Sequence, residues 1–495
     1  MLQTRSLSAR LLAIASGVSF TLLLFYYNHA RISSHLRSFS DTLWEDSPVA
    51  ATVGTCSPDA YASGYWKWSP KTEVAIDNIT TKDDALAFTG FQGCAADREY
   101  YWHLGADVEE KWDRFPDVDY YDWVPGDGCD IRPMRPRDMV RDMVEKGGWL
   151  ILGDSITENH FFSLSCILYP HVRATPNYTE NPYFDRAWPQ NLYLNPSSPL
   201  VQELDIPYDF DIESTPLATF RRVDLLLSRP ELEKLYKETY PDKAETTPLF
   251  SEEQTWSISP QQYMPLFLSL PYSTLIVSTA GHWTTTLMSA FRNESIGEKD
   301  GYGIQDVLEF FEVSMQQWAD DVQSALVSYY NSDEGGGDQW TFGALHYDAP
   351  SDTWRVAGMD DDWTLASMRA LPYAPALART EGSVARDKRV VVRAYLPGHE
   401  DCHNFYQPWW RIKPFQFQWY NWAWIKDFNQ IFQNLLTPQM YPFIHYLPID
   451  RPARLRPDAH ATGDCLHLMS GTGVLEGWSH YIWHYVTTEL EEGKP

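Results

Sequence analysis

The chain has 495 residues, of which 44% are apolar and 15% aromatic, and its formal net charge at pH 7 is -28. This apolar share is enough for a sizeable buried core, so the composition excludes a wholly disordered protein. The strong negative charge repels polyanions. It therefore argues against nucleic acid as a partner and against electrostatic attraction to anionic membranes.

An uncharged, mostly apolar run near the N-terminus, residues 11–27 (LLAIASGVSFTLLLFYY), has a length at the lower limit for a membrane-spanning helix. We predict a single-pass type II signal-anchor at 11–27, with a cytoplasmic tail at 1–10 and a polar stem at 28–55. Positive charges on the two sides are nearly balanced, so they do not fix the orientation alone. A cleaved signal peptide ending near Ala30 is the alternative.

The features that follow this run indicate an oxidising, glycosylating compartment. Three N-x-S/T sequons, the acceptors of N-glycosylation, occur after it, at Asn78, Asn177 and Asn293. The six cysteines also lie beyond it, and their even number suits a set of disulfides: Cys56, Cys94, Cys129, Cys166, Cys402 and Cys465. We therefore expect the region after the anchor to lie in the lumen of the Golgi or of another secretory-pathway compartment.

Two regions follow the stem. Residues 56–146 hold three cysteines among many aromatic and turn residues, which predicts a small, loop-rich N-terminal subdomain. Residues 147–490 alternate between strand-like and helix-like segments, which predicts an α/β domain with a parallel sheet covered on both faces. The Pro-rich stretch at 180–265 gives no clear assignment. The expected strands are 149–152, 273–278, 389–396 and 443–447, and the expected helices are 158–169, 304–330 and 424–436.

The stretch GGWLILGDSITENHFFSLSC, residues 147–166, places a small reactive hydroxyl directly after a buried strand. In an open α/β sheet, ligands gather beyond the carboxyl ends of the strands. Ser155 in such a turn is exposed, and its backbone N–H lies at a helix N-terminus, where it can hold a developing oxyanion. The alternative is that Asp154 and Ser155 simply cap the following helix.

A serine nucleophile needs a base within hydrogen-bond reach, and the base needs a group that orients it. Near the C-terminus, Asp464 and His467 are three residues apart in the sequence GDCLH. At this spacing the carboxylate can fix the tautomer of the imidazole and leave its other nitrogen free for the serine proton. An Asp-x-x-His pair alone is a weak signal, and its position in the chain gives it weight.

These two motifs resemble the first and last blocks of the SGNH/GDSL hydrolase superfamily. More closely, the chain resembles the PC-esterase group, which includes the trichome birefringence-like polysaccharide O-acetyltransferases. Further stretches are similar to that group in the same order, over about residues 56–485, and this shared order is more specific than any one piece. They are Trp123-Val124-Pro125 leading to Cys129, Asn159 with Ser163-Leu164-Ser165-Cys166, Ala280-Gly281-His282-Trp283, RAYLPGHEDC from Arg393 to Cys402, and Arg456-Pro457-Asp458-Ala459-His460.

The resemblance implies an SGNH-like α/β/α sandwich and a catalytic triad of Ser155 as nucleophile, His467 as base and Asp464 as its orienter. The implied reaction is transfer of an acetyl group, through an acetyl-serine intermediate, to a hydroxyl of a cell-surface or wall polysaccharide. The partners would be that glycan, an acetyl donor as co-substrate and, through the anchor, a membrane, with no bound cofactor and no nucleic acid.

The resemblance also has departures. The family's Asn before Gly-His is Thr279 here, so either the Thr279 hydroxyl or the Gly281 N–H would have to donate to the oxyanion. Asn159 and His282 are expected near the substrate by the same resemblance. One cysteine of the terminal block and one of the N-terminal region are missing, as if one disulfide were absent. The remaining pairs implied are Cys56–Cys129, Cys94–Cys166 and Cys402–Cys465, among fifteen possible pairings.

Other clusters have simpler interpretations. The run from His399 to His403 fits no common zinc spacing, and its cysteine is expected in a disulfide, so we predict no metal site there. The acidic run 360–362 is interpreted as a solvated turn rather than a calcium site, and 304–330 as a core helix rather than a binding groove. Packing is the default role of the densest aromatic cluster, with sugar stacking as the alternative: Trp409, Trp410, Trp419, Trp422 and Trp424.

Two rival functions remain open. A carbohydrate acetyl esterase shares the triad and differs in whether water reaches the acyl-enzyme. A non-catalytic glycan-binding module would keep the fold without the chemistry. The presence of all three triad residues argues against the binding module, whereas the altered residue at 279 argues mildly for it.

Overall fold

The computed structural model describes residues 56–70, 82–96, 114–175, 189–253, 255–331, 345–348, 353–356, 386–417, 419–460 and 465–490. Residues Gly54–Pro495 form one compact unit, so the boundary predicted at residue 147 does not separate two compact units. The other unit, Met1–Val53, lies wholly outside the described residues, together with the predicted anchor and stem. No helix in the described ranges is both long and apolar enough to cross a membrane.

A seven-stranded sheet forms the centre of this unit, in the order β11-β10-β7-β3-β6-β5-β4. The strands from β11 to β6 are parallel to one another, and β5 is antiparallel to both of its neighbours. The predicted α/β class with a mainly parallel sheet is therefore confirmed. The bounds are β3 (Gly148–Gly153), β4 (Val172–Thr175), β5 (Gln190–Leu194), β6 (Pro216–Arg222), β7 (Tyr272–Ser278), β10 (Arg389–Arg393) and β11 (Ile444–Leu447).

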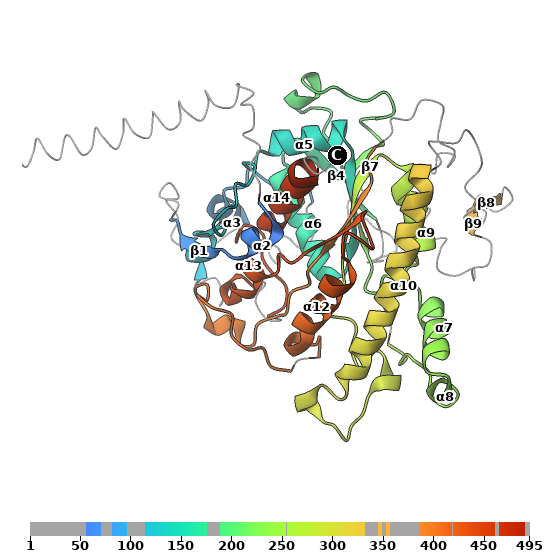
Figure 1. Ribbon diagram of the computed structural model, residues 1–495. Coiled ribbons are helices and arrows are strands. Elements are labelled where there is room, and N and C mark those ends of the chain that lie inside the picture. Colours follow the sequence, from blue (N-terminus) through green and yellow to red (C-terminus); the bar gives the residue numbers. More distant parts are fainter. Residues whose placement is uncertain are drawn as a thin grey trace, which may run out of the picture. The chain divides into compact units, whose positions relative to one another are not determined.

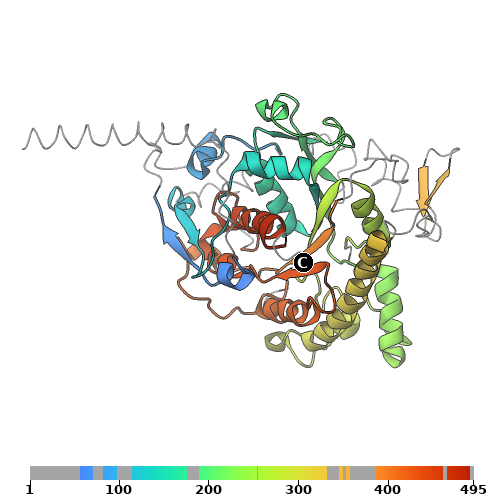
Figure 2. The ribbon, with the colours of Figure 1, turned by 45° about the horizontal axis from the view of Figure 1, so that its top comes forward.

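Helices cover both faces of the sheet (Figure 1). One face carries α5 (Pro136–Glu145), α6 (Ser155–Ile167) and α14 (Val474–His484), and α14 packs along α6. The other face carries α9 (Pro260–Ser269), α10 (Ile304–Asn331) and α12 (Ile425–Leu435). The same layers are seen from a second direction in Figure 2. Every residue of β3 is buried, as expected for a central strand covered on both sides.

The remaining elements are short or peripheral. Strands β1 (Tyr65–Trp68) and β2 (Tyr121–Val124) form an antiparallel pair, as do β8 (Leu345–Asp348) and β9 (Thr353–Val356). The other α-helices are α2 (Pro58–Ala62), α3 (Lys82–Thr89), α7 (Arg229–Thr239), α8 (Pro241–Ala244) and α13 (Arg451–Arg454). Single helical turns lie at Asp117–Asp119, Pro199–Gln202, Ser289–Phe291, Glu298–Asp300, Cys402–Asn404, Trp422–Trp424 and Pro457–Ala459, and α14 continues into a π-helical turn at Tyr485–Glu489.

The Pro-rich stretch 180–265, for which the sequence gives no assignment, contains β5, β6, α7, α8 and the first part of α9. Its helices begin at local signals, since α7 and α9 each follow a serine cap with a capping box and start with a proline or reach one within the first turn. Elsewhere the predicted strands and helices match β3, β7, β11, α10 and α12 closely, whereas β10 ends at Arg393 rather than 396.

All three predicted disulfides are confirmed: Cys56–Cys129, Cys94–Cys166 and Cys402–Cys465. The first lies within residues 56–146, and the second ties that region to the last turn of α6. The third joins two loops at the carboxyl edge of the sheet. Three disulfides are typical of an extracellular or secretory-pathway protein.

Candidate functional site

Ser155 lies at the point where the strand order of the sheet reverses. From β3 the chain next adds strands on one side, through β6, and then returns to add β7 and β10 on the other side. The carboxyl ends of β6 and β7 therefore flank the end of β3, with Arg222 and Ser278 in register with Gly153. Such a switch point is where open α/β sheets bind ligands.

The turn from β3 into α6 is fixed by short-range contacts. The Asp154 carboxylate caps the helix, because its Oδ1 accepts a hydrogen bond from the Ile156 N–H at 3.0 Å. A Cβ at position 153 would lie only 2.2 Å from Thr157 Oγ1, so only glycine fits there. The capping interpretation of this motif is thus correct for Asp154, and it leaves the partly exposed Ser155 side chain unused by the cap.

His467 meets Ser155 across 312 residues of sequence. The distance between His467 Nε2 and Ser155 Oγ is 2.7 Å, which is a hydrogen bond. Both side chains are partly exposed, so a substrate can reach them. With Nε2 accepting the serine proton, the imidazole carries its own proton on Nδ1. The predicted orienter, Asp464, lies outside the described residues.

Several long-range contacts hold the loop that carries His467. The Cys402–Cys465 disulfide tethers it, and the His399 N–H donates to the Cys465 carbonyl at 2.8 Å. The Asn159 amide donates to the Leu468 carbonyl at 2.9 Å. Residues on both sides of His467 are therefore fixed by groups from α6 and from the loop after β10.

A pair of buried histidines also contacts this loop. His399 Nδ1 lies 2.6 Å from His460 Nε2, His399 Nε2 lies 3.1 Å from the Arg454 carbonyl, and His460 Nδ1 lies 3.1 Å from the His467 carbonyl. Both carbonyls can only accept. All three contacts are hydrogen bonds only if one of the two imidazoles carries a proton on both of its nitrogens. Burial lowers the pKa of His399 to about 4, which suits its neutral role as acceptor in the pair.

Thr279 and Asn159, which were expected near the substrate, form hydrogen bonds with other protein groups. The Thr279 hydroxyl donates to the Asp224 carbonyl at 2.8 Å and accepts from the Trp283 indole at 3.1 Å, so its only proton is already used. The amide of Asn159, a fully buried residue, donates to Leu468. The Thr279 hydroxyl therefore has no proton left for a substrate oxygen, and both side chains help to hold the walls of the site.

The Gly281 backbone remains a possible donor. A Cβ at this position would lie 2.5 Å from Tyr395 Oη, and that hydroxyl donates to Asp154 Oδ2 at 2.5 Å, so Gly281 lies close to the serine turn. Within the described part of the chain, neither the Ser155 nor the Gly281 N–H donates to a protein group. Two backbone donors beside a nucleophile are the usual composition of an oxyanion hole.

A charged cluster that the sequence did not reveal borders Asp154. Arg222 Nε is 2.6 Å from Asp224 Oδ1, and both side chains are buried. His282 Nε2 lies 3.4 Å from Asp224 Oδ1 and 3.8 Å from Asp154 Oδ2. Burial lowers the pKa of Arg222, but the charges of Asp224 and Asp154 outweigh it and raise that pKa, so the residue is a permanent cation. His282 is thus beside the serine turn, as expected.

The other predicted sites have simple outcomes. Cys402, His403 and Cys465 lie close enough to hold a metal, but the two cysteines are joined in a disulfide, which removes them as ligands. Asn293 is exposed on a loop, whereas Asn78, Asn177 and the acidic run 360–362 lie outside the described residues. The segment 304–330 is the core helix that was expected, with Phe310, Phe311, Met315 and Trp318 fully buried.

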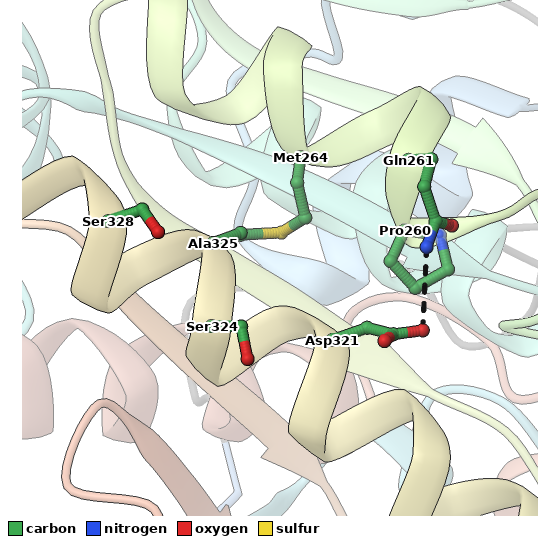
Figure 3. Close-up of a pocket in the computed structure, with 7 residues that line it drawn as sticks. All are labelled: Pro260, Gln261, Met264, Asp321, Ser324, Ala325 and Ser328. Atoms are coloured by element: carbon green, nitrogen blue, oxygen red, sulfur yellow. Dashed lines mark hydrogen bonds between the residues drawn. The ribbon is translucent and has the colours of Figure 1, made fainter. Parts of the chain in front are cut away.

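A surface cavity of about 230 Å³ lies away from these residues, between α9 and α10 (Figure 3). It is lined by Pro260, Gln261, Met264, Asp321, Ser324, Ala325 and Ser328. None of these side chains contributes to the Ser155–His467 pair, so we do not connect this cavity with the chemistry.

The chain matches no protein-family model, and no curated protein matches it significantly.

Proposed function

We propose that this protein is an O-acetyltransferase of the PC-esterase type, in which Ser155 carries the acetyl group. The observation that supports this most strongly is the 2.7 Å contact between Ser155 Oγ and His467 Nε2 at the switch point of the sheet. A serine hydroxyl is a weak nucleophile on its own, and a base at hydrogen-bond distance is what activates it.

In the first half-reaction, Ser155 Oγ attacks the carbonyl carbon of an acetyl ester while His467 Nε2 takes the serine proton. The negative charge that develops on the carbonyl oxygen is stabilised by the N–H groups of Ser155 and Gly281. When the tetrahedral intermediate collapses, the bond to the donor oxygen breaks, and His467 returns the proton to that oxygen. The products are the free donor alcohol and acetyl-Ser155.

In the second half-reaction, a sugar hydroxyl attacks the acetyl-serine carbonyl. His467 now removes the proton of the sugar hydroxyl and then returns it to Ser155 Oγ. Asp464 would orient the imidazole throughout through Nδ1. The same proposal includes membership of the SGNH superfamily and anchoring in a Golgi or other secretory-pathway membrane. The three disulfides support the secretory compartment, but they do not bear on the anchor or the superfamily.

A labelled acetyl group tests the reaction. The full-length protein is incubated with an activated acetyl ester labelled in its acetyl group and with a panel of oligosaccharides, and both the sugars and free acetate are analysed for label. We expect label in a sugar with the wild type and none above background with Ser155→Ala, while the exposed-serine control Ser197→Ala behaves as wild type. Label in acetate alone would identify an esterase, and no Ser155-dependent label in either product would contradict catalysis.

A further inference from the structure

The loop between β10 and α12 borders the Ser155 site at both of its ends. At one end, the Cys402–Cys465 disulfide joins it to the loop that carries His467. At the other end, the ring of Tyr420 lies 5.5 Å from the ring of His282. Residues 402–417 and 419–424, which we call the rim loop, therefore extend from the side of His467 to the side of the charged cluster.

The rim loop presents large aromatic rings to solvent, and that of Trp410 is the most exposed of those described. Trp410 is 81% exposed, which is unusual for so large an apolar side chain. The backbone beneath it is fixed, because the Trp409 N–H donates to the Leu455 carbonyl at 2.7 Å and the Trp409 ring lies 5.0 Å from that of His399. Trp410 is thus displayed from an anchored segment. An indole face of this kind is a suitable surface for the C–H face of a sugar ring.

One cation lies against this ring and a second lies against the ring of the preceding residue, Trp409. The Arg411 guanidinium lies 4.7 Å from the centre of the Trp410 ring, and Lys413 Nζ lies 4.5 Å from that of Trp409. Both cationic side chains are exposed, and neither has an ion pair with any carboxylate in the described ranges. In a chain with 67 acidic and 39 basic residues, these two cations lie on a loop whose ends border the Ser155 site, where they can attract an anionic ligand. The nearest acidic residues in sequence, Glu400 and Asp401, precede the aromatic segment.

We propose that Trp410, Arg411 and Lys413 form an acceptor subsite for a carboxylate-bearing glycan, such as a chain that contains uronic acids. The ring would stack on a sugar, and the two cations would pair with carboxylates along the chain, which leaves a neighbouring hydroxyl to reach acetyl-Ser155. A neutral glycan would use the ring but gain nothing from the cations. This inference rests on the proposed function for its reaction, but the binding that it predicts can be measured without any reaction.

The test compares matched ligands. The full-length protein is titrated calorimetrically with several uronic-acid oligosaccharides and with the same oligosaccharides after reduction of their carboxylates to alcohols. We expect the acidic form of at least one to bind about tenfold more tightly than its reduced form, the effect of two exposed ion pairs, with the preference falling as salt is added. If no acidic oligosaccharide binds more tightly than its reduced partner, or if none binds at all, the proposal is wrong.

Variants separate the ring from the charges. The double change Arg411→Gln with Lys413→Gln is expected to abolish the preference, whereas the exposed control Lys299→Gln keeps it. Trp410→Ala is expected to weaken the binding of both forms about fivefold, which the exposed-aromatic control Tyr208→Ala does not do. A preference that survives the double change would overturn the assignment to these residues.

Acetylation of Ser155 by a small ester distinguishes the two proposals. The rim variants are expected to form acetyl-Ser155 at the wild-type rate, because none of the three residues contacts the catalytic pair. Selective binding without any acetyl-Ser155 would support the subsite and contradict the transferase. Normal acetylation of Ser155 without a preference for acidic oligosaccharides would support the transferase and contradict the subsite.

Discussion

The two members of the proposed catalytic pair, Ser155 and His467, are held in place by different kinds of interaction. Ser155 is positioned almost entirely by its immediate neighbours: a buried strand, a glycine that leaves no room for a Cβ and an aspartate that caps the helix. His467 is positioned by distant groups, namely a disulfide to Cys402, an amide from Asn159 and a histidine pair. The nucleophile is therefore readable in a short stretch of sequence, whereas the base depends on the completed tertiary structure.

Removal of the nucleophile should give the largest effect. Ser155→Ala is expected to lower the turnover of an acetyl ester by about four orders of magnitude or more, and His467→Ala by a similar factor. The double variant should be no worse than either single one, because the two residues act as a unit. Steady-state kinetics of ester cleavage measure this. Additive losses in the double variant would mean that the 2.7 Å contact does not operate in catalysis.

Removal of single disulfides tests whether the position of His467 depends on a distant covalent link. Cys402–Cys465 and Cys94–Cys166 enclose 63 and 72 residues, so chain entropy assigns each a similar stabilisation of about 4 kcal/mol. Loss of the first pair, by serine at both positions, is expected to lower kcat about a hundredfold through displacement of His467. Loss of the second should leave kcat of the folded protein unchanged.

Both disulfide variants are to be measured at a temperature where circular dichroism shows them folded. Equal losses of kcat in the two would indicate that the loop of His467 needs no covalent tether.

The buried histidine beside that loop should make stability depend on pH. The pKa of His399 is about 4 in the fold, below the usual value near 6.5, so between these values the unfolded chain binds the proton that the folded one does not. Its contribution is complete above pH 6.5 and is lost as the pH falls toward 4. Urea unfolding at pH 5 should show about 2 kcal/mol less stability from this group than at pH 7.5.

His399→Gln removes this titration, so the variant is expected to be less sensitive to acid by about the same amount. His445, whose pKa is also lowered to about 4 by burial, supplies a residual dependence in both proteins. Parallel pH profiles for wild type and variant would show that His399 is not buried as a neutral imidazole.

The smallest expected effect concerns Asn159. Asn159→Ala leaves the Leu468 carbonyl without its donor and should lower the free energy of unfolding by about 1–3 kcal/mol. We also expect kcat to fall about tenfold with KM unchanged, because only the position of the base is altered. The control Asn191→Ala removes another buried amide, one that lies in β5 and accepts from Thr219, and should lower stability alone. An equal loss of kcat in Asn191→Ala would contradict the role of Asn159 in positioning His467.

The sequence predicted the features that depend on local contacts better than those that depend on long-range contacts. Gly153, Asp154 and Ser155 were recognisable because strand, turn and cap are local signals, although α6 begins at Ser155 rather than at 158 because the cap lies at Asp154. The three disulfides were implied by the family resemblance and not by spacing. Arg222 escaped notice because its strand lies in a Pro-rich stretch, and its approach to His282 depends on which strands become neighbours.

The hydrogen bonds of Thr279 and Asn159 also show what the sequence could not predict. Their positions in the sequence suggested contacts with the substrate, but their hydrogen bonds go to Asp224, Trp283 and Leu468. A motif shows that a residue belongs to the site. Which atom it contacts is decided by the packing of segments that are hundreds of residues apart.

The most direct test of the account is the acylation of Ser155. The purified full-length protein is treated with an acetyl ester, digested and analysed by mass spectrometry, beside His467→Ala. We predict an adduct of about 42 Da on the peptide that contains Ser155, much slower to form in the variant and discharged by an acceptor oligosaccharide. Absence of the adduct from Ser155 under every donor condition, or its equal formation without His467, would contradict the proposal that this pair performs acyl transfer.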